Sequence, residues 1–230
     1  MQFNLYYKKT FYLFSFIILF LLIFDLASYF YLFTQEKDFL KYYDTYFNME
    51  YERNVPTFFS VLISFLTGVS ALMIYKDIKK NGWLIVSIFF IYFALDDALS
   101  LHEYIGSFIG ERFFKHATNS YYWQITFLPM FAIVGLYVFI FLFFEFKKNR
   151  CTKCMLAIFL GYTCYAVAVG MDYYEGLKPS FSYVMDRTDY FSYRDIVHVL
   201  RVFEEAIEML GATLILSAIL LTRPLKITLS

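Results

Sequence analysis

Six long apolar runs interrupt the charged residues of this chain, and they constrain its fold more than any other feature. The runs cover residues 11–33, 56–74, 83–101, 122–144, 154–171 and 197–221. About 20 apolar residues in a helix cross a hydrocarbon core roughly 30 Å thick, and in lipid a helix satisfies its own backbone polar groups. We therefore expect one domain over residues 1–230, an all-α polytopic bundle of six transmembrane helices.

The charges between the runs predict the orientation of this bundle. Six spans place both termini on one side, and the segments on that side carry 11 of the 20 Lys and Arg residues but only Asp77 and Glu145 among the 20 acidic residues. Because positive charge collects in the cytoplasm, we expect cytoplasmic termini in the inner membrane of a bacterium.

The connections on the opposite side are long, and two of them have an amphipathic pattern. These outer connections cover residues 34–55, 103–121 and 172–194. Apolar residues recur at helical spacing around Tyr43 in the first and around Phe108 in the second, which predicts short surface helices.

The composition points to the lipid bilayer as the main partner. Hydrophobic residues make up 60% of the chain and the formal net charge is zero, which argues against a nucleic-acid partner. Nothing in the residues requires or excludes a homo-oligomer. Cys151 and Cys154 form a CxxC motif on the predicted cytoplasmic side, where thiols stay reduced, so we predict two free thiols.

Acidic residues lie in, or at the outer end of, four of the six runs at a similar depth. Counting about 1.5 Å per residue from the basic inner ends, they lie roughly 20–30 Å above the inner face, in the outer third of the core. They are Asp25, Asp96, Asp97, Asp172, Glu175, Glu204, Glu205 and Glu208. Ionisable groups in hydrocarbon are costly, so this acidic layer predicts a functional site.

Helical spacing predicts that the acidic stripes face the bundle interior. Asp96, Ser100 and Glu103 follow the spacing i, i+4, i+7. The last run has the spacing i, i+3, i+7, i+10 at His198, Arg201, Glu205 and Glu208. Ser60 on the second run could donate a hydrogen bond to the same layer.

Histidines and carboxylates at one depth are the ligand types of zinc, iron or manganese. The expected ligands of such a divalent metal are His102, Glu103, His198, Glu205 and Glu208. Two other interpretations stay open. The layer could be a structural network in which Arg201 pairs with Glu204 or Glu205, or it could be a pathway for protons or cations.

Three stretches carry a resemblance to known proteins. They are Glu52-Arg-Asn-Val-Pro-Thr-Phe-Phe-Ser60, Leu95-Asp-Asp-Ala-Leu-Ser-Leu-His-Glu103 and Glu204-Glu-Ala-Ile-Glu-Met-Leu-Gly211. The chain resembles a family of uncharacterised bacterial multi-pass membrane proteins, in which Asp-Glu is frequent where this chain has Asp96-Asp97. The resemblance implies the membrane architecture and no particular activity.

A looser likeness of architecture links the chain to membrane hydrolases of the alkaline-ceramidase and progestin-receptor type. Those proteins are small helical bundles with a zinc site of histidines and an aspartate near one face, but their His-x-x-x-His motif is missing here.

These observations predict an outward-facing, metal-binding site that hydrolyses a lipid or another amphiphile. Asp96 or Glu204 would act as general base, and the metal would supply hydroxide near neutral pH. The alternatives are a proton- or cation-coupled transporter or channel that uses the same carboxylates, and a non-catalytic sensor or partner subunit.

Overall fold

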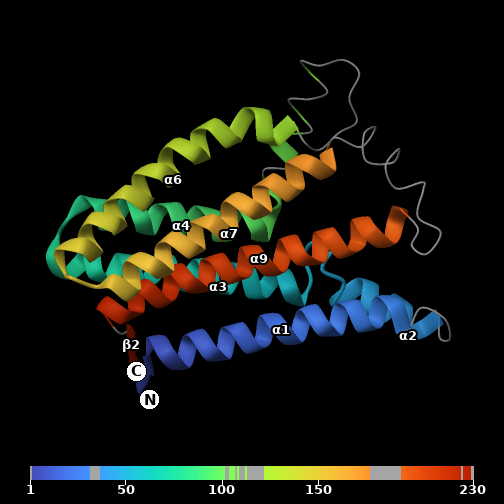
Figure 1. Ribbon diagram of the computed structural model, residues 1–230, viewed down its shortest axis with the longest axis horizontal. Coiled ribbons are helices and arrows are strands. Elements are labelled where there is room, and N and C mark those ends of the chain that lie inside the picture. The colour runs from blue at the N-terminus through green and yellow to red at the C-terminus, as the bar shows by residue number, and fades with distance from the viewer. Residues whose placement is uncertain are drawn as a thin grey trace.

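Six long apolar helices form the bundle in the computed structural model, as predicted (Figure 1). The structure describes residues 2–31, 37–101, 104–106, 108, 112, 122–176, 193–223 and 225–228. The six helices are α1 (Tyr7–Tyr31), α3 (Val55–Ile78), α4 (Asn81–Leu99), α6 (Tyr122–Lys148), α7 (Thr152–Gly176) and α9 (Tyr193–Thr222). The chain is therefore a multi-pass helical membrane protein.

Local signals explain where α3 and α4 begin and end. The Asn54 side chain accepts a hydrogen bond from the Thr57 N–H at 3.0 Å, and Pro56 occupies the first turn of α3. Lys79 ends α3 and Ser100 ends α4, each with a positive φ in the left-handed region.

The two ends of the chain meet in a small antiparallel ribbon that the sequence did not predict. Strand β1 (Gln2–Leu5) pairs with β2 (Leu225–Thr228), and Gln2 lies opposite Thr228. Both termini therefore lie at one end of the bundle, as an even number of spans requires (Figure 1).

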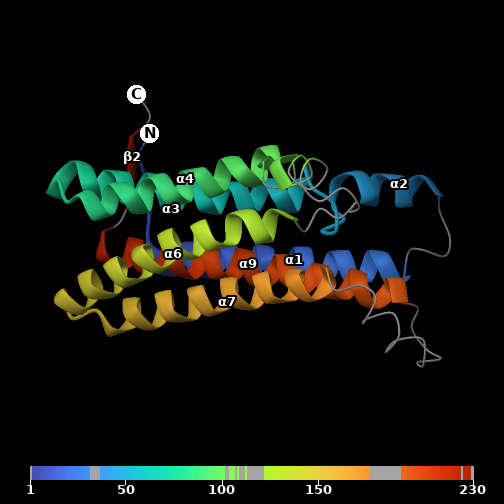
Figure 2. The same cartoon turned by 90° about the horizontal axis from the view of Figure 1, so that it is seen from above.

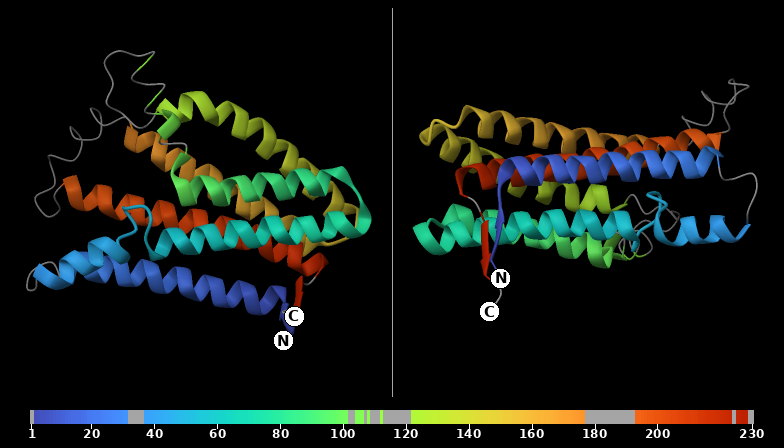
Figure 3. Two further views of the ribbon diagram at one scale, coloured as in Figure 1. Left: turned by 180° about the vertical axis from the view of Figure 1, so that it is seen from behind. Right: turned by 90° about the horizontal axis from the view of Figure 1, so that it is seen from below.

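The first outer connection contains the predicted amphipathic helix, α2 (Lys37–Tyr46). It lies at the end of the bundle far from the termini, beside the end of α1 (Figure 3). Its Tyr43 is only 1% exposed, so the apolar face of α2 packs on protein. The surface helix predicted in the second outer connection lies mostly outside the described residues.

Helix α9 is the centre of the bundle and packs against α1, α3 and α7 (Figure 2). Its crossing with α7 depends on two glycines. A Cβ on Gly211 would lie 2.9 Å from the Gly161 carbonyl oxygen, and a Cβ on Gly161 would lie 2.9 Å from the Gly211 oxygen. The two backbones are in contact, which is how small residues allow membrane helices to approach closely.

The end of the bundle that carries the termini is apolar inside and basic outside. A buried cluster that includes Trp83, Leu142 and Ile219 fills the space between α3, α4, α6, α7 and α9. Both acidic residues at this end form ion pairs, Asp77 with Arg223 and Glu145 with Lys80. Charge at this end is therefore placed on the surface and locally compensated.

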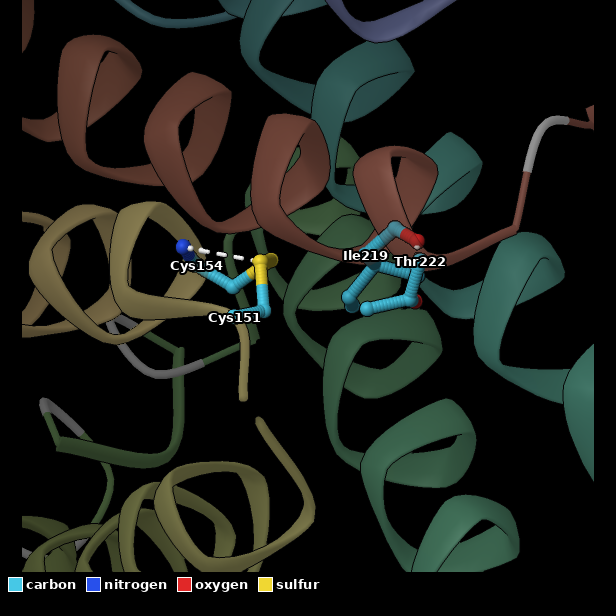
Figure 4. Close-up of a disulfide and its surroundings, with 4 residues drawn as sticks. All are labelled: Cys151, Cys154, Ile219 and Thr222. Atoms are coloured by element: carbon cyan, nitrogen blue, oxygen red, sulfur yellow. Dashed lines mark hydrogen bonds between the residues drawn. A yellow bond between two sulfur atoms is a disulfide. The ribbon is translucent and has the colours of Figure 1, made fainter. Parts of the chain in front are cut away.

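The prediction of two free thiols at this end is wrong. Cys151 and Cys154 form a disulfide at the start of α7, with their Cα atoms 5.3 Å apart (Figure 4). The three-residue separation in the sequence did not decide whether a disulfide forms, because the turn between α6 and α7 sets the distance between the two Cα atoms.

Candidate functional site

The acidic layer divides into two adjoining groups. The first, which we call the buried network, is built on the buried Asp25 and His198 and also includes Glu50 and Arg201, which are partly exposed and line the neighbouring cavity. His198 Nε2 lies 2.7 Å from Asp25 Oδ1, and His198 Nδ1 lies 3.3 Å from Glu50 Oε2. Arg201 Nη1 donates to the other Glu50 oxygen at 2.7 Å. The network joins α1, the segment before α3, and α9.

Packing around His198 fixes the geometry of the buried network. The Tyr29 ring stacks on the imidazole with centroids 3.8 Å apart, and the Tyr29 hydroxyl donates to Asp195 at 2.9 Å. The second oxygen of Asp25 accepts the Met49 N–H at 2.7 Å. Burial and the nearby Asp25 carboxylate raise the pKa of Tyr43, which keeps this neighbour protonated.

The buried network can be electrically neutral. Both imidazole nitrogens can donate only when the ring is protonated, and His198 and Arg201 then balance Asp25 and Glu50. The His198 and Asp25 side chains have 0% exposure, so such a balance lowers the cost of burying them. Both ring nitrogens of His198 face carboxylate oxygens. A metal-bound histidine instead has one ring nitrogen on the ion and the other on a hydrogen-bond partner.

The second group lines a cavity of about 990 Å³ between α3, α4, α6, α7 and α9. Much of its wall is aromatic and comes from α4, α6 and α7. These residues are Phe89, Phe90, Phe93, Phe131, Phe139, Tyr162 and Tyr165. The end of the cavity far from the chain termini is acidic, so the lining is amphipathic along its length.

We call the acidic helix residues of this lining the cavity carboxylates. They are Asp96, Asp97, Asp172, Glu204, Glu205 and Glu208. Glu205 on α9 interacts electrostatically with Asp97 on α4, Asp172 on α7 and Glu52 before α3. The predicted convergence of acidic residues from several helices therefore occurs for these described residues.

A hydroxyl group on α3 and one at the C-cap of α4 hold two of the acids at the cavity. The Ser60 hydroxyl donates to Asp97 Oδ2 at 3.1 Å, as its position on α3 suggested. The Ser100 hydroxyl donates to Glu52. Because α4 ends at Leu99, the predicted continuous helical face from Asp96 through Ser100 to Glu103 is interrupted by the left-handed turn at Ser100.

Several predicted site residues do not meet at a shared metal centre in the described structure. Asp25, His198 and Arg201 belong to the buried network, in which Arg201 pairs with Glu50. His102, Glu103 and the Glu175 side chain lie outside the described residues. Within the part of the chain that the structure describes, no three His, Cys, Asp or Glu side chains are grouped closely enough to hold a metal ion.

Sequence reasoning missed Glu50 and Glu52, because both lie in a connection and outside the apolar runs. A signal existed in retrospect, since they lie four and two residues before Asn54, the N-cap of α3. A cap fixes where a helix begins, so residues just before it are held close to the helix end.

A family model matches residues 13–223, which is most of the chain. This protein belongs to the family described as Domain of unknown function (DUF8692). No curated protein and no solved structure matches it. The match covers α1 from residue 13 and the other five long helices in full, so both the buried network and the cavity carboxylates lie within the matched region.

Proposed function

We propose that this protein binds a lipid or similar amphiphile in the cavity and that the cavity carboxylates act on its polar head. The amphipathic lining is the observation that supports this most. Aromatic side chains of α4, α6 and α7 suit an acyl chain or another apolar body, and the carboxylates lie at one end only. The volume of about 990 Å³ is within the range of small-molecule sites.

The reaction that these groups suit best is hydrolysis. Asp96 or Glu204 would take a proton from water as general base, since both line the acidic end of the cavity. A divalent metal such as zinc, iron or manganese would polarise the scissile group and lower the pKa of bound water. Glu205 and Glu208, together with His102 and Glu103, are the side chains that we propose to hold it.

A transporter would use the same carboxylates for protons or cations, but it also needs a path across the bilayer. The packed cluster around Trp83, Leu142 and Ile219 occupies the other end of the described bundle. Its buried side chains favour binding at one end over passage. A sensor or partner subunit remains the third candidate, and turnover of a bound amphiphile would distinguish it from an enzyme.

The orientation is also part of the proposal. We infer that the basic end and both termini are cytoplasmic and that the cavity carboxylates lie toward the outer leaflet of a bacterial inner membrane. Single cysteines at Lys41 and Lys79 should react with an impermeant maleimide from outside and from inside, respectively. The reverse pattern would overturn this orientation.

The test of amphiphile binding uses two glycines. Gly135 lines the cavity, and a Cβ there would meet only the Phe89 ring edge at 3.5 Å, so Gly135→Leu should fill the cavity from α6. Gly170 on α7 has nothing within 4 Å of an added Cβ, so Gly170→Leu is the matched control. Protein purified in mild detergent would be analysed by native mass spectrometry and elemental analysis.

We expect a co-purified amphiphile on the wild type and on G170L, and its loss from G135L. Retention by G135L at the wild-type level, or no bound amphiphile on a folded wild type after incubation with membrane lipids, would refute the binding proposal. Metal on the wild type that is lost in Glu205→Gln would support the metal-assisted reaction.

A further inference from the structure

The disulfide between Cys151 and Cys154 has no part in the proposed amphiphile site, and its surroundings are those of an exchangeable pair. It lies where α7 begins, beside the end of α9 (Figure 4). Cys151 directly precedes the first residue of α7, and Cys154 is in the first turn. Unpaired N–H groups and the helix dipole at such a position stabilise a thiolate.

Two further features favour a thiolate on Cys151. The Cys154 N–H donates to Cys151 Sγ at 3.3 Å. Four exposed cationic side chains also lie at the end of α6, in the turn and at the start of α7. They are Lys147, Lys148, Arg150 and Lys153. Positive charge near a cysteine raises the thiolate fraction, and with it the rate of disulfide exchange.

The two sulfurs differ in access. Cys151 is half-buried in the turn, whereas Cys154 has 0% exposure and belongs to the apolar cluster with Ile219. An incoming thiolate therefore reaches Cys151 first. This asymmetry divides the roles of the pair into an exposed sulfur that is attacked and a buried sulfur that leaves.

We propose that Cys151 and Cys154 are a redox-active pair that undergoes reversible exchange with thiols of the glutathione class at the basic end of the bundle. One glutathione thiolate attacks Cys151 Sγ, the S–S bond breaks, and Cys154 leaves as a thiolate that takes a proton. A second glutathione thiolate attacks the glutathione sulfur of the mixed disulfide and releases Cys151. Two electrons pass to the pair, and the products are two thiols and one glutathione disulfide.

The predicted cytoplasmic location gives this exchange a physiological setting. Cytosolic thiol pools keep most cysteines reduced, and disulfides that do form there are usually transient, catalytic or redox-sensing. The oxidation state of a pair at this turn would follow the ratio of reduced to oxidised thiols in that compartment. Reduction removes a covalent link between the α6–α7 turn and α7. Both helices joined by this turn, α6 and α7, line the cavity.

The first experiment measures the exchange in the full chain with Cys164→Ser, which removes the remaining cysteine. Membranes are equilibrated in stepped mixtures of reduced and oxidised glutathione, quenched in acid, and labelled with a maleimide that retards the protein on a gel. We expect a reversible transition from oxidised to doubly labelled protein within the glutathione range. A pair that stays oxidised in reduced glutathione alone, while denatured protein is reduced, would overturn the proposal.

The second experiment tests the asymmetry with two single-cysteine chains. The C154S/C164S chain retains Cys151, and the C151S/C164S chain retains Cys154. A helix-start thiol should react with iodoacetamide at pH 7 about threefold faster than a peptide thiol, because an approximately eightfold gain in thiolate outweighs an approximately threefold loss of nucleophilicity. Cys151 should react at about this rate and reach its plateau at lower pH than the peptide.

In folded protein, Cys154 should react more slowly than Cys151 and should not form the glutathione mixed disulfide. Equal rates for the two cysteines, or a Cys151 rate at or below that of the peptide, would overturn the assigned roles. Amphiphile binding by the same C164S background is measured in parallel, so failure of the cavity proposal and failure of the redox proposal are seen separately.

Discussion

The buried network and the cavity carboxylates both lie toward the end of the bundle far from the termini, yet their surroundings differ. In the network, Asp25 and Glu50 contact His198 and Arg201 at hydrogen-bond distance, and the imidazole is enclosed by protein. Glu50 and Arg201 of the network also line the cavity, where Arg201 is the one described basic side chain and the six cavity carboxylates and Glu52 are the other acids. The comparison shows that acids at one end of the bundle can have different neighbours, which the sequence alone does not reveal.

The arrangement of neighbours suggests different roles for the two groups. The buried network links α1 to α9 by local compensation, and that is a stabilising arrangement once the groups are buried. The cavity carboxylates face a volume large enough for a ligand, with Glu205 close to other acids on α4 and α7. We therefore expect substitutions in the first group to affect folding and substitutions in the second to affect binding.

Asp25→Ala should cause the largest loss of stability. It removes the partner of His198 Nε2 and of the Met49 N–H at a site with no solvent exposure. Breaking a buried ion pair from one side costs about 3–5 kcal/mol, and we expect this loss in the free energy of unfolding measured by denaturant titration in micelles. The control Asp77→Ala removes an acid that is 48% exposed and should cost about 1 kcal/mol or less. Equal losses would mean that the network is not a structural centre.

Gly211→Ala should have the next largest effect, because it separates α7 and α9, which carry four of the six cavity carboxylates. The added Cβ would lie 2.9 Å from the Gly161 oxygen and 3.1 Å from Cys164 Cβ. Overpacking of this kind costs about 1–3 kcal/mol. Gly170→Ala is the matched control, since that position is open, and it should leave the thermal midpoint unchanged or raise it. A G211A protein as stable as G170A would contradict the close α7–α9 contact.

Glu205→Gln with Glu208→Gln should weaken amphiphile binding and preserve the fold. Losing charged hydrogen bonds to the bound head costs about 1.5 kcal/mol or more, which is about a tenfold loss of affinity. The free energy of unfolding should not fall, because Glu205 interacts with nearby acids and its neutralisation relieves repulsion. Binding is measured by titrating a fluorescent amphiphile into detergent-solubilised protein. Unfolding of the double variant would assign Glu205 and Glu208 to the scaffold.

Glu145→Gln should have the smallest effect on stability. It shows how much an ion pair outside the acidic layer contributes. Glu145 pairs with Lys80, whose side chain is 49% exposed and also lies over the Phe141 ring at 5.1 Å. Exposed pairs contribute about 0–1 kcal/mol, so thermal unfolding should change little. A loss comparable to that of D25A would erase the distinction between surface pairs and the buried network.

The sequence by itself determined the six helices, the shared end of the two termini and the depth of the acids. Helix length in a bilayer follows from apolar runs, and height follows from a constant rise per residue, so both are local properties. The convergence of Asp96, Glu205 and Glu208 on one cavity could be anticipated in the same way, because helical periodicity places charges on an inward face.

Only the tertiary structure decided which acid meets which partner. Asp25 and His198 are 173 positions apart, and their contact depends on α1 and α9 being neighbours with a particular rotation about their axes. Glu50 reaches Arg201 because a capped segment before α3 returns to the bundle. Hydrophobic periodicity leaves helix order and rotation open, since many arrangements bury the same apolar area, and side-chain packing selects among them.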